Sequence, residues 1–136
     1  MVERAQEARS EMSLDVYLEG PAETVTCVCS ECDHEHTRVV RATLYQANIT
    51  HNLGAMAEEA GLYMWLWRPD ELGVTCAREL IEPLKAGLAL LRSDPAKYEA
   101  FNAPNGWGLY KHFVPFVAKY LAACEEYPEA TARACR

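Results

Sequence analysis

The sequence LDVYLE, residues 14–19, decides the fold class, because apolar and polar residues alternate along it without interruption. Successive side chains of a β-strand point to opposite faces, so Leu14, Val16 and Leu18 share one face. Gly20-Pro21 follows directly and is typical of a turn. The stretch therefore predicts a strand with one buried face and one polar face.

Two more β-rich runs come next. Residues 24–29 and 34–44 are separated by the polar, turn-like residues 30–33, and we expect the two runs to pair as a hairpin. With residues 14–19 they would make the N-terminal third one small antiparallel sheet. At the other end, residues 131–135 alternate Thr, Arg and Cys with alanine, which predicts an edge strand that returns to this sheet.

The middle of the chain has helical periodicity. The first helix is expected to begin at Asn48 as its cap and to end at Gly61. Others follow Thr75 and the Ser93-Asp94-Pro95 cap, and the last covers residues 109–126. The prediction is an α+β fold with a small antiparallel sheet packed against three to four helices. Residues 1–13 are expected to be a flexible lead, and residues 14–136 a single domain.

Charge and composition exclude several classes of function. The 136-residue chain carries a net charge of −7, and its 13 basic residues are scattered, so nucleic acid is not an expected partner. The N-terminus lacks the apolar core of a signal peptide, and no apolar run approaches the roughly 20 residues that span a bilayer. We therefore expect a cytoplasmic protein without a membrane span, whose six cysteines stay reduced.

The sequence CVCSECDHEH, residues 27–36, contains three thiols and two imidazoles at the expected hairpin tip. Zinc prefers tetrahedral thiolate and imidazole ligands, and a Cys-x-x-Cys turn brings two sulfurs together. The predicted ligands are Cys29, Cys32, His34 and His36. The chain has no second Cys-x-x-Cys to complete the usual two-knuckle pattern. The alternative is that Cys27 and Cys29 are buried on the sheet while the histidines are exposed turn residues.

Two other segments have the composition of a binding surface. The start of the first predicted helix offers amide, hydroxyl and imidazole groups beside free backbone N–H groups, which suits an anion or a nucleotide-like ligand. An aromatic and amide-rich loop follows residue 101. The alternative for both is structural: Asn48 or Thr50 caps the helix, His51 and Asn52 bond to neighbouring loops, and the aromatic side chains fill the core. The predicted ligand-binding residues are Asn48, Thr50, His51, Asn52, Trp67, Arg68, Asn105, Trp107 and Tyr110. We predict that the segment around His51 meets the loop around Trp107.

Standard catalytic signatures are missing from the sequence: it contains neither a phosphate loop, nor a nucleophile elbow, nor a His-Glu-x-x-His motif. The leading interpretation is therefore a non-enzymatic protein that binds a small ligand or a partner protein, with no cofactor. The alternative is a zinc-stabilised module, or a metal-dependent enzyme, centred on the Cys/His hairpin. Homo-oligomerisation remains open.

The motifs NITHNL (48–53), MAEEAGLY (56–63), LWRP (66–69) and FN…NGWGLY (101–110) resemble a family of small uncharacterised proteins of tailed phages and prophages. The resemblance covers the chain from about residue 14 onward. It implies an accessory role in the host cytoplasm during infection, such as blocking a host enzyme or sequestering a defence signal. A virion-associated component is a further alternative.

Overall fold

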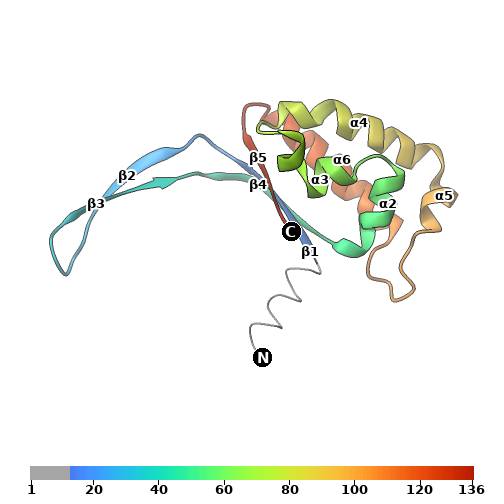
Figure 1. The fold of residues 1–136 in the computed structure, drawn as a ribbon, viewed down its shortest axis with the longest axis horizontal. Coiled ribbons are helices and arrows are strands. Elements are labelled where there is room, and N and C mark those ends of the chain that lie inside the picture. The colour runs from blue at the N-terminus through green and yellow to red at the C-terminus, as the bar shows by residue number, and fades with distance from the viewer. Residues whose placement is uncertain (1–12) are drawn as a thin grey trace.

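The computed structural model describes residues 13–136, and Figure 1 shows its two parts, a helix-covered sheet and a long projecting hairpin. The strands are β1 (Ser13–Glu19), β2 (Glu23–Val28), β3 (Glu35–Val40), β4 (Thr43–Thr50) and β5 (Thr131–Cys135). The helices are α2 (Gly54–Glu59), α3 (Tyr63–Trp67), α4 (Arg78–Ser93), α5 (Pro95–Glu99) and α6 (Tyr110–Glu126), with 3₁₀ turns at His51–Leu53 and Pro69–Leu72. Of the predicted flexible lead, residues 1–12 lie outside the described residues, and Ser13 begins β1.

The main sheet has the strand order β4-β1-β5, and both pairs are antiparallel. Val16 in the central strand pairs with Ala47 on one side and with Ala134 on the other. Leu14, Val16 and Leu18 are completely buried, as the alternation of the sequence predicts. The C-terminal edge strand predicted for residues 131–135 is confirmed.

The helices bury the inner face of this sheet (Figure 1). Leu84 of α4 and Phe113 of α6 are fully buried, and both helices continue through an internal proline. Gly87 lets α4 pack closely against Leu62, since a Cβ at position 87 would overlap the Leu62 side chain. The predicted α+β class, an antiparallel sheet packed against helices, is confirmed.

The hairpin β2–β3 forms a separate two-stranded sheet, which we call the arm (residues 21–41); the other described residues, 13–20 and 42–136, are the body. The arm points away from the helices (Figure 1), and every residue of β2 is exposed. The predicted single N-terminal sheet is therefore wrong, as is the single strand over residues 34–44. The chain changes direction where Gly20 N donates to Ala42 O at 2.8 Å, and beyond that bond none of the labelled helices covers the hairpin (Figure 1).

The predicted helix start at Asn48 is also wrong, because β4 continues to Thr50. Asn48 is paired with Asp15 across the strands, and its Nδ2 donates to Asp15 Oδ1 at 2.9 Å. Thr50 is the actual cap, and its side chain accepts from Asn52 N at 3.3 Å. Cross-strand pairing and the burial of Ile49 thus extend the strand past a residue that would also suit a helix cap.

Candidate functional site

A groove of about 520 Å³ lies between β4 and α6, and residues 106–108 also line it. Its floor and walls are mainly apolar. The strand side is lined by Tyr45, Ala47, Asn48, Ile49 and Thr50, and the remaining walls by Leu53, Gly106, Trp107, Gly108, His112, Pro115, Phe116 and Lys119. The volume falls in the range of small-ligand pockets, so this groove is the candidate binding site.

The two segments predicted to meet do meet at this groove. Asn52 Nδ2 donates to Trp107 O at 2.7 Å, and Asn105 Oδ1 accepts from Trp107 N at 3.0 Å. Gly108 has a φ of 116°, and a Cβ there would lie 2.9 Å from Asn52 Cβ, so only glycine allows this close approach. The backbone of Trp107 is therefore fixed, while its side chain is 64% exposed.

The charged lining of the groove comes from α6. Lys119 is exposed and lines the groove together with Phe116, and His112 lies seven residues, or about two turns, earlier on the same helix. The lining residues include no carboxylate, although the chain as a whole is acidic. On the strand side, Tyr45 stacks on Tyr120 with ring centroids 5.8 Å apart. Burial raises the pKa of Tyr45, with a smaller contribution from Cys124.

His51, Trp67 and Arg68 lie in a different hollow, together with Tyr63 and Arg136. Trp67 is only 2% exposed, and its Nε1 donates to His51 Nδ1 at 2.7 Å. That bond requires His51 Nδ1 to carry a lone pair, so a neutral ring has its proton on Nε2. Hydrogen bonds to Tyr63 and Glu71 raise the pKa of Arg68. These three side chains thus have partners within the body and do not line the groove.

The other predicted ligand-binding residues also lie partly in the groove and partly outside it. Asn52 and Asn105 border a shallow surface hollow beside the loop. Tyr110 is half-buried, and its hydroxyl donates to Leu91 O at 2.7 Å. Of the nine predicted residues, Asn48, Thr50 and Trp107 line the groove.

Sequence reasoning missed Tyr45, His112 and Lys119 as lining residues. A signal for the last two exists, because positions 112, 115, 116 and 119 have the spacing of one helical face. For Tyr45 the signal is its place in strand register beside Ala47 and Ile49.

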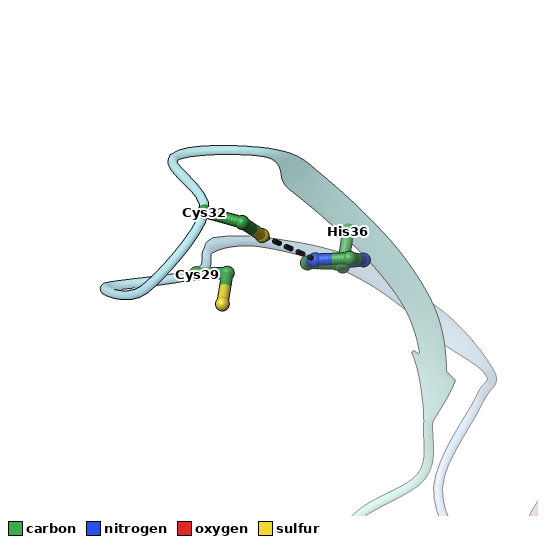
Figure 2. A group of neighbouring side chains, drawn as sticks. All are labelled: Cys29, Cys32 and His36. Atoms are coloured by element: carbon green, nitrogen blue, oxygen red, sulfur yellow. Dashed lines mark hydrogen bonds between the residues drawn. The ribbon is translucent and has the colours of Figure 1, made fainter.

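A second candidate centre lies at the tip of the arm, where Cys29, Cys32 and His36 come together (Figure 2). Their ligand atoms all lie within 4.8 Å of one another, and Cys32 Sγ is 4.0 Å from His36 Nε2. Cys29 N donates to His34 O at 3.0 Å, and Asp33 N donates back to Cys29 O at 2.9 Å. This turn holds the two thiols on the side of His36, and the group could hold a metal ion.

The alternative in which the hairpin thiols are buried in the sheet is wrong, because Cys27 is exposed and Cys29 is half-buried. His34, the fourth predicted ligand, does not belong to the group of three. Its carbonyl group, however, pairs with Cys29 N, so the two residues face each other at the end of the hairpin.

The thiol of Cys29 has a lowered pKa. The backbone N–H of Glu31 is the largest cause, followed by the Cys32 side chain and the Cys32 backbone. A lowered thiol pKa favours the thiolate, which is the form that binds metals. In the body the opposite holds for Cys124, because burial raises the pKa of its thiol to about 12.

Within the described part of the chain, no helix is long and apolar enough to cross a membrane. No family model, no curated protein and no solved structure matches this chain.

Proposed function

We propose that this protein is a non-enzymatic binding protein, and that the groove between β4 and α6 holds a small ligand or a segment of a partner protein. One observation carries the proposal: the two segments whose composition is typical of recognition surfaces supply Asn48, Thr50 and Trp107 to one groove, and Asn52 Nδ2 donates to the backbone oxygen of Trp107. A fixed loop loses little entropy when its aromatic side chain is covered by a ligand.

The groove chemistry favours binding over catalysis. Its polar side chains are a tyrosine, an amide, a threonine, a histidine and a lysine, and no carboxylate from residues 13–136 lines it to act as a partner for His112. Lys119 and Trp107 suit an anion that carries an apolar or aromatic part, and a nucleotide-like ligand has that chemistry. The resemblance to tailed-phage proteins supports an accessory setting in the host cytoplasm, where such a ligand would be a defence signal or part of a host protein.

Native mass spectrometry of the protein purified from the cells that naturally make it tests this proposal. We expect a retained ligand or partner that is lost in Trp107→Ala. Trp107 is largely exposed, so this change should leave the fold intact. The matched control is Phe101→Ala, which removes another exposed aromatic side chain that does not line the groove. A retained mass that is the same in all three proteins, or no retained mass in any of them, would contradict the proposal.

A second candidate function is that of a zinc-stabilised module, and the Cys29, Cys32 and His36 group favours it. An isolated two-stranded hairpin is marginally stable in water, and the arm buries no core residue. Zinc held between β3 and the turn would cross-link the two strands. In a tetrahedral site a sulfur and a nitrogen ligand are about 3.6 Å apart, so the observed 4.0 Å needs little adjustment. His34 is the proposed fourth ligand.

Cobalt(II) titration under reducing conditions tests the metal proposal, because tetrahedral thiolate coordination gives intense visible absorption. We expect about one cobalt ion per chain, displaced by zinc. Cys29→Ser should abolish the absorption, and His34→Ala should weaken binding without abolishing it. Cys135→Ser changes another exposed thiol outside the group and is the matched control. Equal spectra for Cys29→Ser and Cys135→Ser would rule out the site.

A further inference from the structure

The two outer edges of the main sheet differ in whether a neighbouring backbone pairs with them. Beside β5, residues 75–77 run along the strand: Ala132 N donates to Thr75 O at 3.0 Å and Ala77 N to Ala130 O at 2.9 Å. Among residues 13–136, no strand pairs with the outer edge of β4, which is the other end of the sheet. An edge strand presents a row of backbone N–H and C=O groups that can pair with another chain. The edge of β4 is thus available for pairing.

The eight-residue sequence of β4, TLYQANIT, lacks charges, prolines and glycines, and its one irregularity is a register shift at Leu44, near the start of the strand. Each of the other four strands in the described part carries at least one charged residue. Proteins usually protect exposed edges with charges, prolines or bulges to prevent unwanted pairing. Beyond that shift, residues 45–50 form a regular and neutral edge, which is what a strand needs if it is to accept a partner strand.

The groove lies directly beside this edge. Tyr45, Ala47 and Ile49 alternate along β4 and point to the face that the helices cover, where they line the groove. A strand added at the usual spacing of about 4.8 Å would send alternate side chains to this same face. They would enter the space in front of α6, beside Phe116 and Lys119. Main-chain hydrogen bonds from an edge, combined with side-chain pockets between that edge and a helix, are a known mode of peptide recognition.

The charge of the groove indicates the chemistry of the added strand. Lys119 forms no ion pair within the described residues, and no carboxylate lines the groove. A strand with carboxylates beside apolar residues would complement both Lys119 and Phe116. A second copy of the chain would bring its own β4, which has no carboxylate to offer Lys119. The observations therefore favour a heterologous acidic strand over a dimer through β4.

We infer that the groove binds an extended acidic peptide segment of a partner protein, which adds to β4 as a fourth strand of the main sheet. The inference rests on the proposed function and specifies its partner class. The peptide backbone pairs with residues 43–50, its apolar side chains fill the groove, its carboxylate meets Lys119, and Trp107 covers one end.

Selection from a library of random 12-residue peptides against the full chain tests this inference. We expect enrichment of peptides that alternate apolar and acidic residues. The strongest peptide is then titrated against the protein by calorimetry, together with a version N-methylated at every second residue on its pairing edge. N-methylation removes backbone donors and should weaken binding by about tenfold or more, whereas methylation on the opposite edge should have little effect.

Charge reversal on α6 supplies the matched pair of variants. Lys119→Glu should weaken the selected peptide about tenfold or more, because a carboxylate then faces the acidic peptide. Lys111→Glu makes the same change on an exposed residue of the same helix that does not line the groove, and should leave the affinity nearly unchanged. Sedimentation at the titration concentrations should show one chain with one peptide.

The failures are distinguishable. No enrichment, or binding that is indifferent to N-methylation or to Lys119→Glu, overturns the strand-addition inference. So does a stable dimer that excludes the peptide. If native mass spectrometry still shows a small molecule lost in Trp107→Ala, the proposed groove function stands and only the partner class is wrong. If that ligand is also missing, both proposals fail.

Discussion

The arm and the main sheet are both antiparallel, yet every residue of β2 is exposed while alternate residues of β1 are fully buried. Hydrogen bonding between the strands is common to the two regions, so it does not account for the difference. The difference is the helical layer, which covers β1 and ends before the arm begins (Figure 1). The comparison teaches that side-chain burial stabilises the body, whereas the arm depends on strand pairing and on whatever binds at its tip.

The largest effect should come from matched valine truncations in the two regions. Val16→Ala in β1 removes a completely buried side chain and should lower the free energy of unfolding by about 2–4 kcal/mol. Val39→Ala in β3, where the side chain is 67% exposed, should change it by less than about 0.5 kcal/mol. Chemical denaturation of both variants measures the contrast. Equal losses would show that the arm shares the core of the body.

A matched pair of histidines gives the next largest contrast. His51→Ala leaves the indole N–H of Trp67 without its acceptor in the body, and should cost about 1–3 kcal/mol. His36→Ala in the exposed arm should cost less than about 0.5 kcal/mol when metal is removed by chelation. Thermal melting with a chelator present compares the two. A His51→Ala variant as stable as the wild type would contradict a structural role for the bond between Trp67 and His51.

The thiols of Cys29 in the arm and Cys124 in the body have pKa values shifted in opposite directions, so their reactivity distinguishes the two regions without a stability measurement. The pKa of Cys29 is lowered by hydrogen bonds, so its thiolate fraction at a given pH exceeds that of an ordinary thiol. The pKa of Cys124 is raised to about 12 by burial, so this residue remains a thiol well above pH 8. In metal-free protein, iodoacetamide should modify Cys29 at a lower pH than a free cysteine peptide, and Cys124 only after unfolding.

Peptide mapping by mass spectrometry, repeated across pH, gives the two alkylation profiles. Rapid modification of Cys124 in the folded protein would mean that α6 opens easily. If Cys29 is alkylated only at the same pH as the free cysteine peptide, or at a higher pH, the turn does not lower the pKa of its thiol. Added zinc should protect Cys29 and leave Cys124 unchanged, since only the first belongs to the arm.

How much could be predicted from the sequence depends on whether the decisive interaction is local. The alternation at residues 14–19 predicts β1 correctly, because a period of two is a property of the segment itself. The predicted helix start at Asn48 is wrong because the strand conformation of Asn48 depends on its pairing with Asp15, 33 residues away. The separate arm was missed because alternation shows which residues share a face and not whether another layer covers that face.

The same reasoning applies to the sites. Cys29 and Cys32 could be identified as a ligand pair because the spacing of a turn is local, and His36 joins them from the next strand. The meeting of the segment around His51 with the loop around Trp107 is predicted from an antiparallel return of the last helices, and the bond from Asn52 to Trp107 confirms it. The assignment of Trp67 and Arg68 to one surface with Trp107 could not be checked locally, and the structure separates them into another hollow.

Removal of the arm should have the smallest effect on the body. Gly20 and Ala42 are hydrogen-bonded at the junction, so residues 21–41 can be replaced by the two-residue turn Asn-Gly. The arm contributes no side chain to the buried core, and the melting temperature of the remaining protein should fall by only a few degrees, roughly the effect of 1 kcal/mol or less. Loss of cooperative unfolding in this variant would contradict the division into arm and body.

Native mass spectrometry of three proteins purified side by side from the cells that make them tests the central claim, that binding belongs to the body and metal to the arm. The wild type should carry both the groove ligand and one metal ion. The arm-deleted variant should retain the ligand and lose the metal, while Trp107→Ala should retain the metal and lose the ligand. Loss of the ligand from the arm-deleted variant, or of the metal from Trp107→Ala, would contradict the account.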